Sequence, residues 1–294
     1  MTHICSTPID APLPEEIARM TDALEHARRD MPKSVMSAPK RFTIATLVNN
    51  RTHYDEMRQS FEDGGFKRSD CEYLFIDNTG AQQTCAYRGL DRLLSEAQGE
   101  YVILCHQDVR IVDDGRPELE ARLAELDTID PTWAVAGNAG GISAGRLAIR
   151  ITDPHGANRH VGQLPAKVMS LDENLLIVKR SSRLSFSRDL SGFHFYGADL
   201  CLIADVLGHS AYVIDFHLEH LSGGVKGASF AVMEDAFRDK WSHALRPRFL
   251  QTTCSLINLA GDSLGRMLGR VAGPPLARIS KRLPSASGWT RRSA

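Results

Sequence analysis

The sequence predicts an α/β protein with a mostly parallel central sheet and helices on both faces. From residue 41 onward, short apolar runs alternate with helical patterns, and several runs are apolar at nearly every position. Strands buried on both faces have this continuous apolar character, and such alternation is typical of parallel sheets. The chain has 294 residues, of which 43% are apolar and 24% charged, so its composition is that of an ordinary globular protein.

The elements of this sheet follow one another in order. Apolar runs predict the strands, and apolar side chains at helical spacing predict the helices between them. The predicted strands cover residues 42–48, 73–76, 101–105 and 133–136, and the predicted helices cover 52–62, 82–97 and 117–126.

The stretch from 145 to 190 has a different character. Short alternating segments at 147–151, 168–171 and 175–178 predict further strands, and helical patterns are few in this stretch. A last strand is predicted at 211–216. The helix after it is indicated by apolar residues at spacings of three or four, namely Phe230, Met233, Phe237 and Trp241.

These patterns divide the chain into three parts. Residues 1–40 predict a helical appendage with a linker, and 41–250 form the main domain, with a first half at 41–140 and a second at 141–250. Residues 251–294 form a basic tail. Its apolar residues predict a helical stripe of Leu256, Leu259, Leu264, Met267, Leu268 and Val271. We leave three alternatives open for the tail: docking on an anionic membrane, packing on the domain, and a disordered basic end.

Charge and cysteine content exclude several classes of protein. The net charge is −1, so the chain lacks the basic field of a nucleic-acid-binding protein, and no nucleic-acid partner is expected. The six cysteines form no CxxC pair, which indicates a reduced, cytoplasmic chain without a disulfide framework. Neither a secretory signal nor an apolar run long enough to span a membrane is present in the sequence.

Polar residues follow three of the predicted strands. Ligands of open parallel sheets bind at the carboxyl ends of the strands, so these residues are candidates for one site. They are Asn49 and Asn50, Asp77 and Asn78, and His106, Gln107 and Asp108. Because GxGxxG and GxxxxGK[ST] motifs are missing, a bound nucleotide would be held by side chains and a metal ion.

His106 and Asp108 are the clearest local indication of a ligand-binding site. Positions i and i+2 on a strand point the same way, so both can face a ligand. An imidazole and a carboxylate suit Mn²⁺ or Mg²⁺ on a diphosphate, whereas the alternative is a solvated strand end. His217 and His220 are three residues apart and would face opposite sides of a strand, so His220 alone is a candidate metal ligand. The alternative for either residue is a satisfied core or surface histidine.

Asp199 lies among aromatic and small residues before an apolar run. A partly desolvated carboxylate there would suit general-base work, whereas the alternative is the N-cap of the following helix. The two roles can coexist. A GxSxG nucleophile elbow is missing, so serine hydrolysis has no support.

Six short motifs follow one another within the stretch from about Arg41 to Trp241, which makes up about two thirds of the chain. They are FIDN at 75–78, AYRGL at 86–90, CHQDV at 105–109, SLDE at 170–173, GFHFYGAD at 192–199 and HLSG at 220–223. With these motifs the chain resembles family 2-like glycosyltransferases of the GT-A fold. It is most similar to a bacterial group in which His-Gln-Asp replaces the usual Asp-x-Asp. The resemblance implies a Rossmann-like, mostly parallel central sheet and a small mixed sheet on the side where the acceptor binds.

The resemblance also implies a role for each candidate residue. Asp108 would bind the divalent metal ion with His220 as second ligand, and Asp199 would be the catalytic base. His106 would contact either the metal ion or the ribose. The residues expected to hold the nucleotide are Asn49, Asn50, Asp77, Asn78, Arg88, His106 and Gln107. The residues expected beside the sugar or acceptor are Asp172, His194 and Tyr196.

The implied reaction moves a sugar from a nucleotide-diphosphate sugar to a hydroxyl acceptor with inversion. Mn²⁺ or Mg²⁺ is the implied cofactor, UDP is favoured over GDP and dTDP, and a glycan or lipid-linked molecule is the implied acceptor. The implied reaction would be a step of surface polysaccharide or glycoconjugate synthesis. It would take place on the inner face of the cytoplasmic membrane if the tail docks there. A homodimer is left open. Two rival interpretations are a catalytically degenerate scaffold and a sugar-1-phosphate nucleotidyltransferase, although VNNRTHYDE after the first strand lacks the glycine-rich loop of the latter.

Overall fold

The computed structural model of the protein describes residues 40–224, 227–251, 256–261, 263–265, 267 and 271. The helices of this part are α2 (Arg51–Asp63), α3 (Ala86–Glu96), α4 (Arg116–Ile129), α5 (Tyr196–Val206) and α6 (Ala228–Ala244), with a 3₁₀ turn at Arg180–Ser182. The predicted appendage at 1–40 lies, except for Lys40, outside the described residues.

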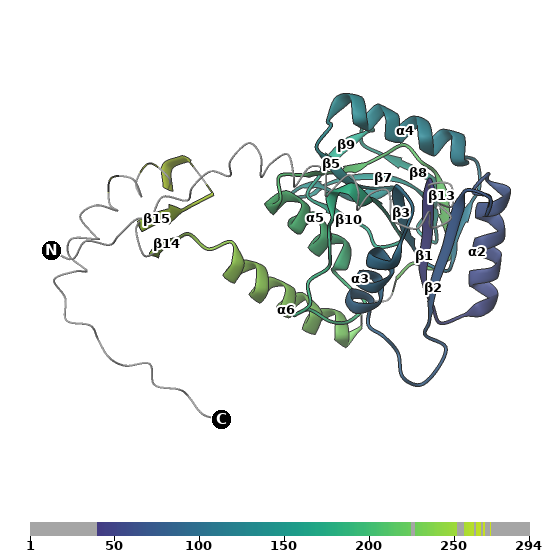
Figure 1. Ribbon diagram of the computed structural model, residues 1–294, viewed down its shortest axis with the longest axis horizontal. Coiled ribbons are helices and arrows are strands. Elements are labelled where there is room, and N and C mark those ends of the chain that lie inside the picture. Colours follow the sequence, from purple (N-terminus) through teal and green to yellow (C-terminus); the bar gives the residue numbers. More distant parts are fainter. Residues whose placement is uncertain are drawn as a thin grey trace, which may run out of the picture.

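A seven-stranded sheet forms the centre of the described chain (Figure 1). Its strand order is β2–β1–β3–β11–β5–β12–β9. In chain order these are β1 (Phe42–Val48), β2 (Cys71–Asp77), β3 (Tyr101–Cys105), β5 (Trp133–Gly137), β9 (Ala166–Val168), β11 (Leu175–Lys179) and β12 (Ser210–Val213). β2, β1, β3, β5 and β12 run in one direction, whereas β11 and β9 run in the other.

A second, mixed sheet lies beside the first. Its strands are β4 (Val109–Ile111), β6 (Ala139–Ser143), β7 (Arg146–Asp153), β8 (Gly156–Val161), β10 (Ser170–Leu171) and β13 (Leu218–His220). A separate hairpin joins β14 (Arg248–Gln251) to β15 (Leu256–Leu259). Figure 1 shows this hairpin beyond the far end of α6, away from the central sheet.

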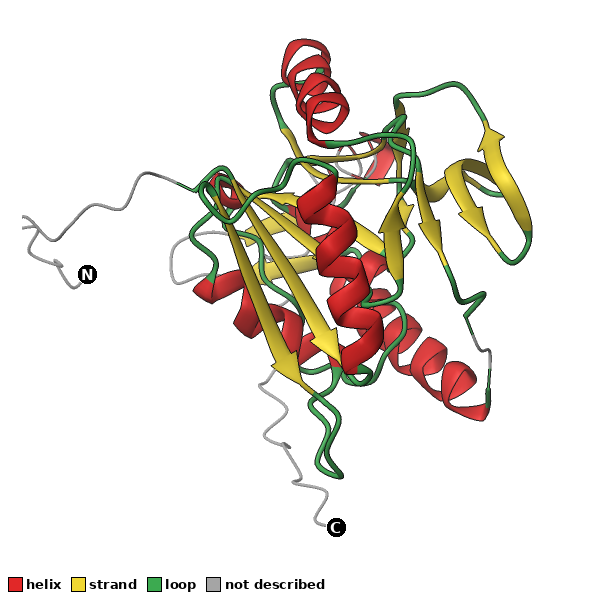
Figure 2. Cartoon of the chain, turned by 90° about the vertical axis from the view of Figure 1, so that its right-hand side faces the viewer, coloured by secondary structure: helices red, strands yellow, loops and turns green. Residues whose placement is uncertain are grey.

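Helices cover both faces of the larger sheet (Figures 1 and 2). The alternation of side chains along β1 explains this arrangement, because Phe42, Ile44 and Val48 belong to one buried cluster and Ala45 to the other. The first cluster includes residues of α2 and α4, and the second includes residues of α3 and α5. The predicted fold class is therefore confirmed: a mostly parallel sheet with helices on both faces, and a smaller mixed sheet.

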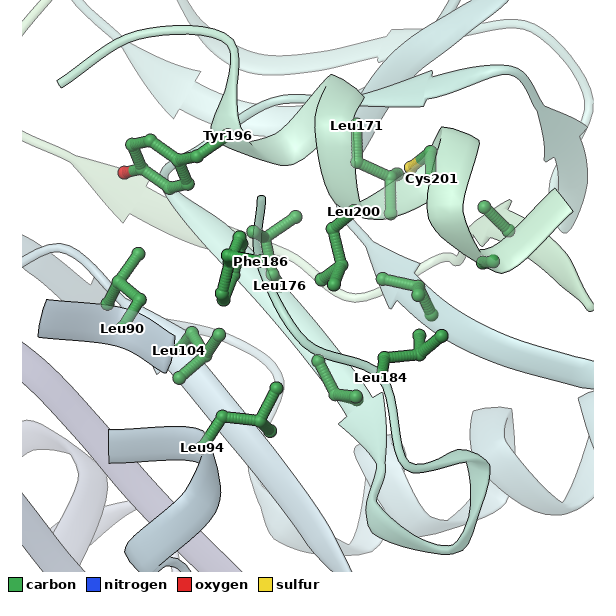
Figure 3. Close-up of a cluster of buried hydrophobic side chains, with 14 of the residues drawn as sticks. Leu90, Leu94, Leu104, Leu171, Leu176, Leu184, Phe186, Tyr196, Leu200 and Cys201 are labelled. Carbon is green, nitrogen blue, oxygen red and sulfur yellow. The ribbon is translucent and has the colours of Figure 1, made fainter. Parts of the chain in front are cut away.

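The second cluster packs α3 and α5 against one face of the central sheet. Figure 3 shows Leu90 and Leu94 of α3 facing Leu200 of α5 across Leu104 and Leu176 of the sheet. Tyr196, the first residue of α5, lies at the border of this cluster.

Several predicted boundaries are wrong. The helix predicted at 82–97 begins only at Ala86, because Asn78 anchors the preceding loop through hydrogen bonds with Thr84. The strand at 211–216 is not the last one, since β13, β14 and β15 follow β12. Leu256 and Leu259 belong to strand β15, so this part of the tail is not the predicted helical stripe.

Candidate functional site

A cluster of two imidazoles and one carboxylate lies where β3 ends. His106 and Asp108 follow β3 as predicted but lie in the turn before β4, so the i, i+2 rule of a strand does not apply to them; both side chains nevertheless reach the same place. His220 arrives from β13, because antiparallel pairing of β13 with β4 sets His220 opposite Val109. The backbone N–H of Leu221 then donates to the carbonyl oxygen of Asp108 at 3.0 Å.

The three side chains present ligand atoms to a common point. His106 Nδ1 lies 3.2 Å from His220 Nε2, and Asp108 Oδ1 lies 3.4 Å from the same nitrogen. One ligand atom from each residue lies within 4.8 Å of the other two. Two nitrogens and one carboxylate oxygen fit a transition ion such as Mn²⁺ better than Mg²⁺, which prefers oxygen ligands. The chemistry of these residues therefore fits the implied metal ion.

The electrostatics of the cluster favour the protonation states that metal ligands need. Burial alone would raise the pKa of Asp108, but hydrogen bonds with His220 and Ser222 outweigh burial and hold the pKa below its usual range. Burial, together with the neighbouring His220, lowers the pKa of His106. A carboxylate and a neutral imidazole both bind metal ions without first losing a proton.

Tyr196 determines which nitrogen of His106 is free. Its hydroxyl donates to the carbonyl oxygen of Glu173 at 3.3 Å and lies 2.8 Å from His106 Nε2. Because the phenol has a single proton, His106 donates from Nε2 to the phenol oxygen, which leaves the lone pair on Nδ1. Nδ1 is the nitrogen that faces His220, so the hydrogen bond prepares His106 as a ligand.

A cavity of about 230 Å³ opens beside the cluster. Its polar walls come from the ends of several strands and from the start of α5. They are Asn49, His106, Gln107, Asp108, Glu173, Tyr196 and Ser222, and the apolar walls are Leu47, Leu90, Leu104 and Cys105. The cavity therefore combines two of the three candidate metal ligands, His106 and Asp108, with one further carboxyl group, that of Glu173.

Glu173 is a site residue that the sequence analysis did not single out. It precedes β11, and β11 begins at the carboxyl edge because Leu175 pairs with Cys105. Burial, and to a lesser extent the charge of Asp172, raises the pKa of Glu173 to about 8. Hydrogen bonds from backbone N–H groups at the start of α5 partly offset the rise. Gly197 permits the start of α5 to lie close to the backbone of Leu171, since a Cβ at Gly197 would lie 2.4 Å from the carbonyl oxygen of Leu171.

Asp199 lies outside this cavity. Its side chain is 0% exposed and accepts hydrogen bonds from the N–H of Ser187 at 3.0 Å, Ser187 Oγ at 2.7 Å and Trp241 Nε1 at 3.1 Å. The N-cap interpretation is wrong, because Asp199 lies inside the first turn of α5, after Phe195 as the N-cap. Burial raises the pKa of Asp199 and these three donors oppose the shift. Its contacts join α5 to α6.

The amide of Gln107 anchors the loop after β1. Gln107 Oε1 accepts from the backbone N–H groups of Asn49 at 2.9 Å and Asn50 at 2.8 Å. Asn50 caps α2 by accepting from the N–H of His53. Of these three expected nucleotide contacts, Asn49 and Gln107 line the cavity and Asn50 does not.

Three other expected nucleotide contacts lie away from the cavity. Asp77 pairs with Arg51 at 2.6 Å, and hydrogen bonds from Thr79 together with this pair lower the pKa of Asp77 to about 2. Asn78 is buried and holds the loop before α3. Arg88 is exposed on α3.

Only one of the three expected sugar and acceptor contacts lines the cavity. Tyr196 lines the cavity, whereas Asp172 and His194 do not. Asp172 is exposed and accepts from the N–H of Asn174, and the His194 ring packs 5.2 Å from that of Phe230.

His217 is separate from the cluster, as the sequence analysis expected. Its Nδ1 lies 2.9 Å from Asp113 Oδ2, and its Nε2 lies 2.9 Å from Thr152 Oγ1. Both ring nitrogens are therefore engaged with residues outside the cluster.

Comparison with known proteins identifies a relative. The protein called ATP synthase subunits region ORF 6 from Fuscovulum blasticum is 36% identical over 226 residues, which cover 75% of this chain and 91% of that protein. The chain belongs to the same family. No protein-family model matches the sequence.

Two solved structures are also similar to the chain. The mannosyltransferase PcManGT from Pyrobaculum calidifontis, in complex with GDP-Man and Mn²⁺, is 15% identical, with a TM-score of 0.44 over 76% of this chain and 69% of that one. TarS 1-349 from S. aureus, in complex with UDP-GlcNAc, is 13% identical, with a TM-score of 0.46 over 67% and 64%.

Proposed function

We propose that the protein is a nucleotide-sugar-dependent glycosyltransferase that requires a divalent cation. The observation that carries the proposal is the cluster of His106, Asp108 and His220 beside a cavity that also contains Glu173. The cavity lies at the carboxyl edge of a mostly parallel sheet, which is where ligands of such sheets bind. The order of the six motifs, which resembles that of family 2-like glycosyltransferases, supports the same function.

His106, Asp108 and His220 would hold the cation, and Mn²⁺ fits this ligand set best. Such an ion stabilises negative charge that develops on a departing diphosphate. Asn49 and Gln107 line the same cavity and offer amide groups for hydrogen bonds to the nucleotide sugar. We propose an inverting transfer from a UDP-sugar to a hydroxyl of a glycan or lipid-linked acceptor in surface polysaccharide or glycoconjugate synthesis.

Glu173 is the base that the geometry favours. In an inverting transfer, the acceptor hydroxyl attacks the anomeric carbon, the bond from that carbon to the diphosphate breaks, and the hydroxyl proton passes to a base. Glu173 lines the cavity, and its raised pKa of about 8 makes it a good proton acceptor once it is ionised. Asp199 was expected in this role, but its buried carboxylate is occupied by Ser187 and Trp241.

Membrane association is the second part of the proposal. Large apolar side chains near the end of the described chain are exposed: Leu250, Ile257, Leu259, Leu264, Met267 and Val271. The sequence from 263 to 294 is basic, so contact with an anionic bilayer would combine apolar insertion with charge attraction. Every helix in the described part of the chain is too short or too polar to cross a bilayer. The proposal is a peripheral contact on the inner face of the cytoplasmic membrane.

The function is tested by release of nucleoside diphosphate from a panel of UDP-, GDP- and dTDP-sugars, with Mn²⁺ and with EDTA. The expected result is slow hydrolysis of at least one nucleotide sugar, dependent on Mn²⁺ and faster with the right acceptor. Asp108→Asn is the matched inactive variant. A sugar nucleotide formed from a sugar 1-phosphate and a nucleoside triphosphate would instead identify a nucleotidyltransferase. Neither binding nor turnover of any nucleotide sugar would favour a scaffold.

A further inference from the structure

A second and larger cavity lies at the opposite edge of the central sheet. Its volume is about 810 Å³, which falls within the range of about 300–1,000 Å³ found for ligand sites. Its walls include Arg41 before β1, Glu100 before β3, and Arg180 after β11. β3 is five residues long, so the two cavities lie roughly 15 Å apart along the strands.

The walls of this cavity carry an excess of positive charge. Five basic residues line it, against two acidic ones, although the whole chain has a net charge of −1. They are Lys40, Arg41, Arg180, Arg183 and Arg188, with Asp91 and Glu100. Positive side chains gathered around a concavity focus the field and attract anions.

Both acidic residues already have partners. Glu100 forms an ion pair with Arg41, and Asp91 accepts the backbone N–H of Phe186 at 3.0 Å. Neither Arg183 nor Arg188 forms an ion pair with any residue in the described part of the chain. Two guanidinium groups at the cavity therefore have their charge uncompensated by a neighbouring carboxylate.

The backbone holds this wall in a definite shape. Arg180 Nε donates to the carbonyl oxygen of Gly99 at 2.7 Å, which joins the turn after β11 to the segment before β3. Gly99 must be glycine, because a Cβ there would lie 2.4 Å from the backbone nitrogen of Thr43. Arg183 has a φ of 52°, a left-handed conformation that is uncommon for a residue with a side chain. Leu94 and Leu184, labelled in Figure 3, close the cavity from the core side.

We propose that this cavity binds a multiply charged phosphate-bearing anion, with Arg183 and Arg188 as its principal contacts. Guanidinium groups bind phosphate oxygens through paired, charge-assisted hydrogen bonds, which is the chemistry that two unpaired arginines offer. The anion is either a soluble phosphorylated molecule or the headgroup of an anionic lipid. The site is separate from the proposed active site and uses none of its residues.

The test uses inorganic pyrophosphate and the full-length protein in EDTA, so that no metal ion bridges the anion to the active site. Isothermal titration is expected to show saturable binding at one site. Arg183→Gln with Arg188→Gln is expected to weaken binding at least about tenfold. The matched control is Arg92→Gln with Arg146→Gln, which removes the same charge from two exposed arginines outside the cavity and is expected to bind normally.

Asp108→Asn keeps this test independent of the proposed function, because that variant is expected to bind pyrophosphate in EDTA as the wild type does. A second arm measures sedimentation with phosphatidylglycerol vesicles and with neutral phosphatidylcholine vesicles. Loss of pyrophosphate binding in the Arg183 and Arg188 variant identifies a soluble anion, and loss confined to anionic vesicles identifies a lipid headgroup. The proposal is overturned if the variant and the charge-matched control behave alike in both arms.

Discussion

The phenol oxygen of Tyr196 lies 2.8 Å from His106 Nε2, and this contact assigns the free lone pair of His106 to Nδ1. Tyr196 is the first residue of α5, whereas His106 follows β3, so the start of a helix orients a candidate metal ligand at the end of a strand. Partners of this kind fix the ring orientation and tautomer of metal-binding histidines.

Tyr196→Phe is therefore expected to weaken Mn²⁺ binding by about 10-fold or more, because His106 loses its orienting partner. Isothermal titration with Mn²⁺ measures the effect, and circular dichroism checks the fold. Tyr212→Phe is a matched control, since that phenol bonds to Asp130, far from the cluster. Equal Mn²⁺ affinity in the two variants would show that the hydroxyl of Tyr196 does not prepare the site.

Asp108→Asn is expected to abolish the Mn²⁺-dependent part of stabilisation by UDP. The substitution removes the negative charge from the ligand set while it keeps the size of the side chain. A ligand that binds only the native state raises stability by RT ln(1 + [L]/Kd), so a thermal-shift titration reports the loss. Mn²⁺ is expected to stabilise the wild type more than Mg²⁺, because two of the three ligands are imidazoles. Asp55→Asn, which removes an exposed acid of α2 that is not among the expected nucleotide contacts, is the control.

Glu173→Gln is expected to lose turnover, whereas Asp199→Asn is expected to lose stability. Glu173→Gln cannot accept a proton, so turnover should fall by ~10²-fold or more while the melting temperature is retained. Asp199→Asn turns an amide N–H₂ toward a buried donor, which should cost about 1–3 kcal/mol of stability. Turnover and thermal unfolding of both variants, measured side by side, separate the two roles. If Asp199→Asn keeps its stability and loses turnover, Asp199 is the base.

The pH dependence of turnover follows from the raised pKa of Glu173. The base acts when ionised, so turnover should rise with pH and level off above a midpoint higher than that of an ordinary glutamate. Stability changes in the opposite direction. Because the folded pKa of about 8 exceeds the unfolded value of 4.5, the stabilising contribution is complete below pH 4.5 and is lost as pH rises through 8. Unfolding by urea at several pH values should show this slope in the wild type and a weaker one in Glu173→Gln.

The end of the chain is expected to bind anionic vesicles. Leu264→Glu with Met267→Glu places charge on two exposed apolar side chains and should reduce flotation with anionic liposomes. Val232→Glu is a control, because Val232 is also an exposed apolar side chain but lies on α6. High salt should weaken wild-type binding. Unchanged flotation of the double variant would exclude this segment as the anchor.

The sequence by itself determined most of the strands and helices that build the central sheet, although not β9. Apolar runs such as residues 42–48 and 101–105 have the bounds of β1 and β3, because a strand buried on both faces favours apolar side chains at nearly every position, and the two threonines of β1, Thr43 and Thr46, are themselves buried. The same reasoning marked His106 and Asp108, which follow β3 at the edge where ligands bind. Local pattern was sufficient there, since each signal lies within a few residues of the feature it predicts.

Only the tertiary structure decided which acid faces the cavity. Glu173 precedes β11, an antiparallel strand that brings its amino end to the functional edge, whereas a rule about carboxyl ends considers only parallel strands. Asp199 has a local sequence suited to a base, but Ser187 and Trp241, far apart in the chain, enclose it. His220 meets Asp108 through the pairing of β13 with β4. Contacts between distant segments depend on strand direction and packing, and a single sequence encodes neither locally.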